Sequence, residues 1–417
     1  MLNDQRPNSA PNPANLDNTT IIIGGGIAGC ATAYALAKRN IKVTLVERHH
    51  ALATEASGNP FAVLYPRLTG QNTALEALNI HGYLHTLQWL NTLGIALCQY
   101  HACGVVQLAI NPKLQTQHAK LAAVYKNTGL QFQYSNADEL SQIAGVALHY
   151  SGLYFAQAGG INLAHLCRTL VTHPNITVLN HTEALQIKQT AQSKWQMLTN
   201  AGETCLLEAD NIVIANANDA TKFSQTAHIP LIASRGQLTF LNSTHAQNLR
   251  TILCGDGYIT PAINHLHTLG ATFSTQDNDT ELRAADHESN LQLLKNMSAP
   301  LYDDLQHNIA SGRVAWRCQT TDYLPAAGPL LDVDALKSGQ FFYNDAATKL
   351  PWLKGLYINV GHGAKGFLSA PLCADVIASH IANEVTNLPK SLLNGLHPAR
   401  FILREIGFKA LAKQLVI

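Results

Sequence analysis

The chain has 417 residues, of which 47% are hydrophobic and 13% are charged. This composition supports a large buried core and excludes a disordered chain. The net charge of +1 gives the whole molecule no strong bias toward nucleic acid or an anionic membrane. The eight cysteines form no Cys-x-x-Cys pair, so we expect no metal site. Without a recognisable signal peptide or an apolar run near the ~20 residues of a membrane span, a cytoplasmic protein with no membrane partner is expected.

The first predicted elements form a β-α-β unit. Residues 1–19, rich in Asn and Pro, predict a disordered leader. A short apolar strand at Thr20–Gly24 enters a glycine cluster, and small and apolar residues at helical spacing follow over Ile27–Arg39. A second buried strand is predicted at Lys42–Glu47. The segment Ala51–Thr69, dense in Ser, Gly, Asn and Pro, predicts a loop.

The middle of the chain is rich in strands, and a strand-glycine-helix unit follows it. This order predicts an α/β fold, in which a Rossmann-like nucleotide domain is assembled from separated segments and a mainly antiparallel α+β domain is inserted between them. The remaining expected elements are helices at Leu75–Leu93, Asn162–Val171, Glu288–Leu305 (interrupted near Pro300) and Gly366–Asn383, and strands at Gly104–Ile110, Gly152–Ala156, Ile176–Asn180, Asn211–Ala215, within 232–273 and at Gly355–Val360.

A dinucleotide-binding motif stands between the first strand and helix. Gly24 permits the tight turn, Gly26 lets a diphosphate approach the backbone, and Gly29 lets the helix pack closely on the strand. The exposed N–H groups and the dipole of the helix attract phosphate. Glu47 ends the next strand, 18 residues beyond Gly29, where a ribose-binding carboxylate is expected. The alternative is a glycine-rich turn in an ordinary α/β protein, but the flanking strand, helix and acid favour the dinucleotide site.

Two features favour FAD over NAD, which the glycine motif alone does not distinguish. A loop after Glu47 contains Ser57 and Asn59, which are suited to holding a cofactor. A distant strand enters Gly361–Gly366 and a helix whose positive end suits the C2=O/N1 edge of a flavin. Lys365 adds a positive charge at this helix end, unless it is an ordinary solvent-exposed lysine at the start of the helix. The expected cofactor-binding residues are Gly24, Gly26, Ala28, Gly29, Glu47, Arg48, Ser57, Gly58, Asn59, Gly361, Gly363, Ala364, Lys365, Gly366 and Phe367.

At these residues the chain resembles the D-amino-acid-oxidase-like superfamily of flavin amine oxidases. The likeness covers about residues 20–385 and includes Pro230, Arg235-Gly236-Gln237 and a terminal Gly-His-Gly-x-x-Gly. A narrower resemblance is to the flavin half of the bifunctional 5-methylaminomethyl-2-thiouridine tRNA modification enzymes. It rests on Ala56–Pro60, Leu64–Leu68, Asp256–Pro261, Gly270–Phe273, Arg317–Pro325, Gly361–Ala370 and Leu396–Arg400.

The narrower resemblance implies a reaction and its partners. The expected substrate is 5-carboxymethylaminomethyl-(2-thio)uridine at the wobble position of tRNA. Loss of a hydride from the α-carbon of its N-substituted glycine arm gives an imine, which hydrolyses to glyoxylate and the 5-aminomethyl base. FAD is expected to be bound non-covalently, although Cys318 invites comparison with covalently linked relatives. A methyltransferase acting on the product is a further expected partner, with no S-adenosylmethionine site expected in this chain.

This chemistry needs a cation for the substrate carboxylate, and arginine suits that planar group. Arg317 occupies the position where related amine oxidases place such an arginine, unless it forms a structural ion pair with Asp322. Arg67 is the second candidate for this role. Tyr258 is expected to orient the substrate, unless it is an ordinary buried tyrosine. No general base is assigned, and His362 beside the flavin is interpreted as a hydrogen-bonded structural residue.

The basic C-terminal tail has two interpretations. Residues 390–417 carry five basic side chains and one acidic side chain, a net +4. In the first, these cations bind tRNA phosphates. In the second, the tail is an amphipathic helix that packs on the body, and Arg400, Arg404 and Lys413 form its solvent-exposed face. The expected divisions are 1–19 as leader, 20–75, 140–225 and 320–389 as FAD-binding domain, 76–139 and 226–319 as substrate domain, and 390–417 as tail.

Two other functions remain open at the level of sequence. A flavin oxidase of a free small amine, such as glycine, sarcosine or a D-amino acid, has the same fold and the same need for Arg317. A tRNA-binding protein without activity has the same basic tail. The Leu-Tyr-Pro-Arg stretch and the tail favour the tRNA-modifying enzyme over the oxidase.

Overall fold

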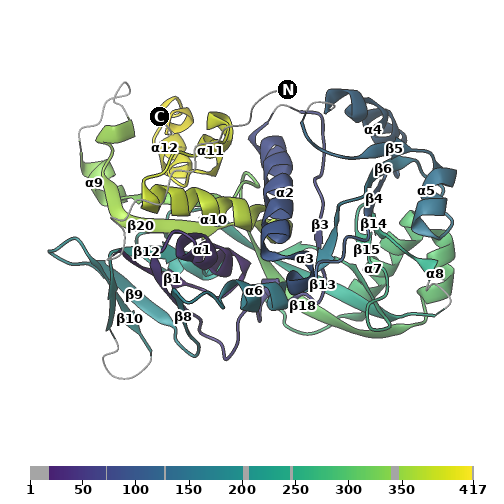
Figure 1. Cartoon of the computed structure of the whole chain (residues 1–417), viewed down its shortest axis with the longest axis horizontal. Coiled ribbons are helices and arrows are strands. Elements are labelled where there is room, and N and C mark those ends of the chain that lie inside the picture. The colour runs from purple at the N-terminus through teal and green to yellow at the C-terminus, as the bar shows by residue number, and fades with distance from the viewer. Residues whose placement is uncertain are drawn as a thin grey trace.

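The computed structural model describes residues 18–71, 73–125, 128–200, 206–244, 248–339 and 347–415. The predicted leader lies outside these residues except for Asn18 and Thr19, and Thr19 already belongs to the first strand. Figure 1 shows a six-stranded sheet with its helices on the left and a nine-stranded sheet on the right, with helix α2 (Ala74–Leu93) standing between them.

The six-stranded sheet carries the predicted nucleotide fold. Its strand order is β19-β20-β12-β1-β2-β8, and every pair is parallel except β19 with β20. The apolar runs of Val and Ile suit strands that are buried on both faces. Helix α1 (Ile27–Ala37) connects the first two strands, which confirms the predicted β-α-β unit. The strands are β1 (Thr19–Ile23), β2 (Lys42–Val46), β8 (Ile176–Leu179), β12 (Asn211–Ile214), β19 (Ala326–Leu331) and β20 (Trp352–Val360).

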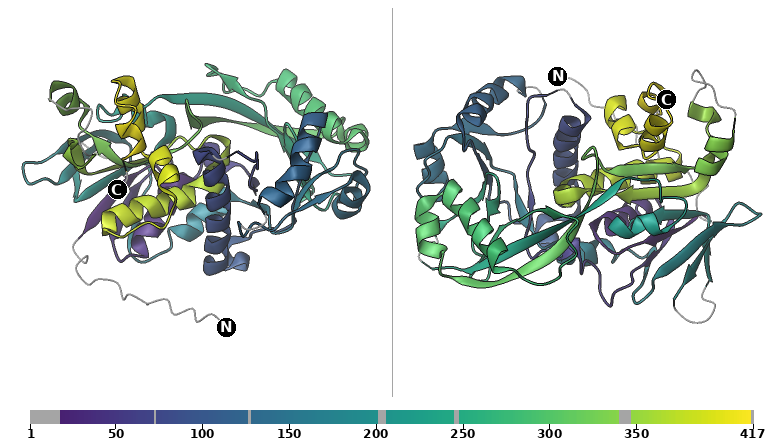
Figure 2. Two further views of the ribbon diagram at one scale, coloured as in Figure 1. Left: turned by 90° about the horizontal axis from the view of Figure 1, so that it is seen from above. Right: turned by 180° about the vertical axis from the view of Figure 1, so that it is seen from behind.

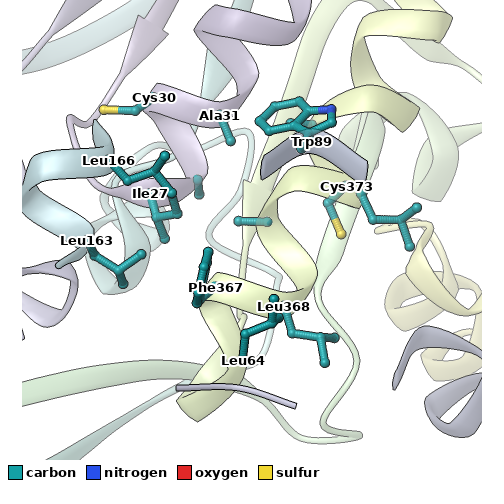
Figure 3. Close-up of a cluster of buried hydrophobic side chains, with 14 of the residues drawn as sticks. Ile27, Cys30, Ala31, Leu64, Trp89, Leu163, Leu166, Phe367, Leu368 and Cys373 are labelled. Atoms are coloured by element: carbon teal, nitrogen blue, oxygen red, sulfur yellow. The ribbon is translucent and has the colours of Figure 1, made fainter. Parts of the chain in front are cut away.

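Helices from distant parts of the chain form the core beside this sheet. Helix α10 (Gly366–Ala382) packs on α1 and on α2, and α6 (Leu163–Leu170) packs on α1. Small residues in α1, such as Ala31, let α10 approach closely. Figure 3 shows the buried side chains that these helices share with β3 (Ala62–Leu64): Ile27, Cys30, Ala31, Leu64, Trp89, Leu163, Leu166, Phe367, Leu368 and Cys373.

The nine-stranded sheet is mainly antiparallel, as predicted, with β14 and β4 as a parallel pair. Helices α7 (Ala284–Met297) and α8 (Ala299–Leu305) cover its outer side, away from the six-stranded sheet (Figures 1 and 2). The predicted break near Pro300 is confirmed, because Ser298 caps the second helix and Pro300 lies in its first turn. The strands are β4 (Val105–Leu108), β5 (Gln133–Ser135), β6 (Gly152–Phe155), β13 (Leu231–Asn242), β14 (Ile252–Cys254), β15 (Tyr258–Ile259), β16 (Leu266–Gly270), β17 (Ser274–Thr275) and β18 (Ile309–Thr320).

Several strands were not predicted from the sequence, including the following. The loop predicted at Ala51–Thr69 contains β3, which pairs with β7 (Gly159–Ile161). Strand β18 pairs with β13 along its whole length, but its two arginines and its glycine obscure the apolar pattern. A separate three-stranded sheet contains β9 (Ala184–Gln189), β10 (Trp195–Thr199) and β11 (Leu206–Ala209). The remaining described helices are α3 (Ile95–Cys98), α4 (Pro112–Val124), α5 (Ala137–Ala144), α9 (Val333–Ser338), α11 (Lys390–Leu396) and α12 (Arg400–Glu405).

Two of the expected domain boundaries disagree with this arrangement. Strand β6 belongs to the nine-stranded sheet, so the boundary expected at residue 140 does not coincide with the division between the two sheets. Helix α2, most of which was assigned to the substrate domain, packs on α10, where the Thr86 hydroxyl donates to the Leu368 carbonyl at 3.1 Å. Both differences arise because packing partners distant in sequence, and not local composition, decide the sheet or helix layer to which a segment belongs.

The C-terminal tail packs on the body and does not expose all its cations. Arg400 is fully buried, and its Nε and Nη2 atoms donate to the Asp322 carboxylate at 2.9 and 2.8 Å. Arg404 reaches the same carboxylate at 3.1 Å from a surface position, with 46% of its side chain exposed. Arg400 is therefore neither free to bind phosphate nor on a wet face, and both sequence interpretations are wrong for this residue.

The pair of arginines around Asp322 makes a stability prediction. Arg400→Met removes the buried partner of a charged group and should lower the free energy of unfolding by about 3 kcal/mol. Arg404→Met removes a surface partner and should cost at most about 1 kcal/mol. Urea denaturation of both variants measures the difference. Equal small losses would contradict the structural role of Arg400.

Candidate active site

The glycine turn after β1 has the tight geometry that the motif predicts. Gly24 has φ +108°, and a Cβ there would lie 2.7 Å from the Ala215 carbonyl oxygen. A Cβ on Gly29 would lie 1.8 Å from the carbonyl oxygen of Gly24. Only glycine fits these contacts, so the turn and the start of α1 are fixed against β1 and β12.

The start of α1 opens into a pocket. Gly26 is its N-cap and offers no side-chain cap, while the Ile27 N–H donates to the Ser57 hydroxyl at 3.0 Å. Ser57 thereby lies where phosphate oxygens would meet the positive helix end. The pocket is lined by the glycine turn, four other segments and four single residues: Ile23–Gly26, Val46–His49, Ala53–Ser57, Thr182–Ala184, Ala215–Ala217, Asp219, Lys222, Phe223 and Trp316.

Glu47 is the fixed acid of this pocket. Its buried carboxylate accepts from the Gly25 N–H at 2.7 Å and from the His49 N–H at 2.8 Å. These bonds hold it at the end of β2, where it can accept from ribose hydroxyls. Arg48 instead forms ion pairs with Glu55 and Asp219.

The pocket fits the adenine dinucleotide part of FAD. The buried Asn216 Oδ1 atom in its wall has no hydrogen-bond partner within the described part of the chain. Buried polar atoms are normally satisfied, so this atom is suited to a donor on a bound molecule. An open helix end, a fixed acid and an unsatisfied amide oxygen together match diphosphate, ribose and a polar neighbour.

The Ala56–Asn59 loop is tied to the nine-stranded sheet. Arg313 on β18 donates from Nη1 to Asn59 Oδ1 at 2.7 Å and from Nη2 to the Thr54 carbonyl at 2.9 Å. A Cβ on Gly58 would lie 2.7 Å from Arg313 Nη2. Gly58 and Asn59 therefore anchor the loop to β18. Arg313 was not predicted from the sequence, because its role depends on a strand that was not predicted.

A second glycine turn leads from β20 into α10. Gly361 and Gly363 have φ values of +82° and +57°, and His362 bridges to Gln319 on β18. Helix α10 has 17 residues and no side-chain cap at its start, so its positive end is available for a flavin edge. Ala364 is exposed in this turn. Phe367 instead points into the core beside Tyr100, so only its backbone is available to a cofactor.

His362 is a hydrogen-bonded residue, as the sequence analysis preferred. Its ring nitrogens contact Ser369 Oγ at 2.8 Å and Asn359 Oδ1 at 3.1 Å. Burial lowers its pKa to about 4. The ring is thus neutral at neutral pH and serves to hold the turn.

Arg317 lies flat against the inner face of the nine-stranded sheet. It pairs in register with Ser234, and a Cβ on Gly236 would lie 2.2 Å from its Nη1 atom. Nη1 also donates to the Thr272 carbonyl at 3.2 Å. Asp322, the alternative partner, binds Arg400 instead, and no carboxylate pairs with Arg317 among the residues that the structure describes.

Tyr258 shares the face of Arg317. In the sheet, Tyr258 pairs with Gly270, Gly270 pairs with Leu238, and Leu238 pairs with Arg313, so these residues share one face. Arg317 lies four residues after Arg313 on β18 and therefore lies on the same face. Burial raises the pKa of Tyr258 to about 12, against the opposing effect of the Arg317 charge. Tyr258 is therefore a neutral hydroxyl beside a cation.

Lys365 is the cation on the opposite wall. Its ammonium donates to Asn79 Oδ1 on α2. Burial, followed by the charge of Arg67, lowers its pKa to about 7, whereas Glu76 acts to raise it. Arg67 itself is exposed.

Cys254 lies between the two walls. It pairs with Tyr258 across β14 and β15, and it interacts electrostatically with both Tyr65 and Lys365. The structure therefore brings Arg317, Tyr258, Lys365 and Arg67 to one region. Their roles stay predictions. Cys254 and Asn79 were missed, although Asn79 is a polar residue on the buried face of a predicted helix.

A family model described as FAD dependent oxidoreductase matches residues 19–380. The chain belongs to this family. The predicted fold class and FAD as cofactor are thereby confirmed, and non-covalent binding stays a prediction.

Two relatives are named tRNA 5-methylaminomethyl-2-thiouridine biosynthesis bifunctional protein MnmC. The one from Methylobacillus flagellatus is 41% identical over 97% of this chain and 62% of its own length. The one from Pseudomonas savastanoi pv. phaseolicola is 39% identical over 95% of this chain and 61% of its own length. The chain thus spans about three fifths of these relatives, and the narrower resemblance is confirmed.

Solved structures agree on the fold. Glycine oxidase from Geobacillus kaustophilus has a TM-score of 0.72 at 19% identity, covering 89% of this chain and 97% of its own. L-proline dehydrogenase from P. horikoshii has a TM-score of 0.75 at 15% identity, covering 93% and 98%. Within the described residues, no helix has the length and apolar character needed to cross a membrane.

The low pKa of Lys365 predicts a pH effect on the cofactor-free protein. Its pKa falls from 10.5 to about 7 on folding, so between these values the unfolded chain holds a proton that the folded chain lacks. The free energy of unfolding should therefore rise with pH across this window, by up to about 1.4 kcal/mol per pH unit. Lys365→Met and Lys365→Gln should both lack this contribution. Urea denaturation at pH 7, 8 and 9 measures it, and parallel profiles for wild type and variants would contradict it.

Proposed function

We propose that this chain catalyses the FAD-dependent oxidative removal of the carboxymethyl group from 5-carboxymethylaminomethyl-(2-thio)uridine at the wobble position of tRNA. The products are 5-aminomethyl-(2-thio)uridine and glyoxylate. The structural observation that carries the proposal is Arg317, a cation without a carboxylate partner in the described chain, lying over Gly236 beside Tyr258. The relatives' names supply the class of substrate.

The residues of the site have complementary tasks in this reaction. FAD, when bound, would supply the acceptor for the hydride, which carries both electrons away from the α-carbon of the substrate arm. Arg317 binds the carboxylate of that arm with its planar guanidinium. Tyr258, neutral at physiological pH, offers a hydroxyl to orient the arm. The imine hydrolyses with one water, which breaks the C–N bond and releases the 5-aminomethyl base and glyoxylate.

The opposite wall serves the cofactor in this proposal. The start of α10 and Lys365 lie together at the second glycine turn, and both favour negative charge at the pyrimidine edge of the flavin. Ser57, Glu47 and Asn216 hold the dinucleotide at the first turn. Positioning and charge are thus supplied by the protein, and the redox step by the cofactor.

The alternative, oxidation of a free small amine, is less supported. The glycine oxidase structure shares the fold at 19% identity, which does not extend to a substrate. Arg317 and Tyr258 serve either substrate, whereas the relatives near 40% identity carry a tRNA-modification name. We therefore assign tRNA as the partner and the cytoplasm, where tRNA is modified, as the location. Because those relatives are bifunctional, a methyltransferase that acts on the aminomethyl product is a further partner.

The proposed function predicts which nucleoside accumulates without the protein. Mass spectrometry of wobble nucleosides from cells that lack this chain should show 5-carboxymethylaminomethyl-(2-thio)uridine in place of its products. With purified protein, carboxymethylated tRNA should bleach the flavin under anaerobic conditions. Bleaching by glycine or sarcosine alone, together with unchanged nucleosides, would overturn the proposal.

Arg317 and Gly236 make a linked prediction. Arg317→Ala should raise KM for carboxymethylated tRNA by 10- to 100-fold, because a charged hydrogen-bonded contact is worth about 1.5–3 kcal/mol. Gly236→Ala should act in the same direction, because its Cβ would displace the guanidinium. FAD content, measured by absorbance, should stay unchanged in both. Wild-type kinetics in Arg317→Ala would rule out the carboxylate contact.

A further inference from the structure

An exposed aromatic ring lies beside Arg317. Phe273 follows β16 on the short loop to β17, and 55% of it is exposed. The guanidinium carbon of Arg317 lies 5.5 Å from the centre of its ring. Phe273 thus combines a free aromatic surface with contact to the residue assigned to the substrate carboxylate.

Exposure alone would not distinguish Phe273, because single exposed apolar side chains are common on protein surfaces. Its position makes the difference. The backbone carbonyl of Thr272, the residue directly before Phe273, accepts a hydrogen bond from Arg317. Ring, carbonyl and guanidinium therefore form one unit at the rim of the substrate face.

Resting on the proposed function, we propose that Phe273 is a specificity-determining residue that stacks the unpaired wobble base. Single-stranded nucleotides are recognised by stacking on aromatic side chains, with their bases splayed out of the loop. A free amino acid has no base to stack. The ring would therefore select a nucleotide over a small amine that Arg317 also accepts.

The dimensions of the substrate suit this arrangement. Its arm joins the base to the carboxylate carbon through four single bonds of about 1.5 Å, which extend to roughly 5 Å. The Arg317 guanidinium and the Phe273 ring centre are 5.5 Å apart. A carboxylate bound at Arg317 thus leaves the base within reach of the ring face.

The test measures binding of an anticodon stem-loop with unmodified uridine at the wobble position to the FAD-loaded protein. This probe has the base but no carboxylate, so Arg317 contributes little to its affinity. Phe273→Leu keeps an apolar side chain and removes the ring, and should raise the Kd about tenfold, as expected for the loss of one stacked base. Phe273→Tyr should restore affinity to within about twofold. Tyr134→Leu is the matched control, because Tyr134 is an exposed aromatic residue on β5, at the far edge of the same sheet from β17.

Kinetics then separate stacking from an indirect effect on Arg317. Phe273→Leu should raise KM for carboxymethylated tRNA about tenfold and leave anaerobic flavin reduction by sarcosine unchanged. Equal losses with tRNA and sarcosine, an altered flavin spectrum, or an unchanged Kd for the stem-loop would each overturn the role of Phe273. If the wild type fails to oxidise carboxymethylated tRNA, the proposed function fails instead, so the two failures are distinguishable.

Discussion

The antiparallel ladder between β13 and β18 is the interaction on which the site depends. It sets Arg317 opposite Ser234 and beside Gly236, so the guanidinium lies on the sheet. Toward the start of β18, the same ladder places Arg313 against the loop of the first glycine motif. At the other end of the strand, Gln319 bridges to His362 in the second glycine turn. One strand thus fixes the distance between Arg317, the proposed carboxylate-binding cation, and both glycine turns.

Charge in the site is divided between two walls. Arg317 has a neutral hydroxyl and an aromatic ring beside it, while Lys365 has an amide oxygen and a second cation nearby. Burial disfavours the charged form of both groups and lowers the pKa of each. Binding of an anionic substrate and an anionic cofactor would offset the free-energy cost of burying these two cations. Each wall is therefore suited to its own negative partner.

The sequence predicted the first βαβ unit well, because its strand, glycine turn and helix are contiguous and Gly29 meets the carbonyl of Gly24 within the same segment. Strand β20 and helix α10 were predicted for a similar reason, since apolar periodicity and glycine punctuation mark both. Strand β18 was not predicted, because its residues show no clear strand pattern by themselves and form a strand through their pairing with β13. Arg313 and Cys254 were missed as well, since their neighbours are brought together by strand register and not by spacing along the chain.

The contact of Arg400 with Asp322 closes a loop of 78 residues. A ring this long is costly in chain entropy to close, and it joins a turn after β18 to a helix that is made much later on the ribosome. The turn also leads into β19 and stands next to the bridge between Gln319 and His362. The turn that leads into β19 can therefore make its final contacts only once helix α12, near the end of the chain, is present.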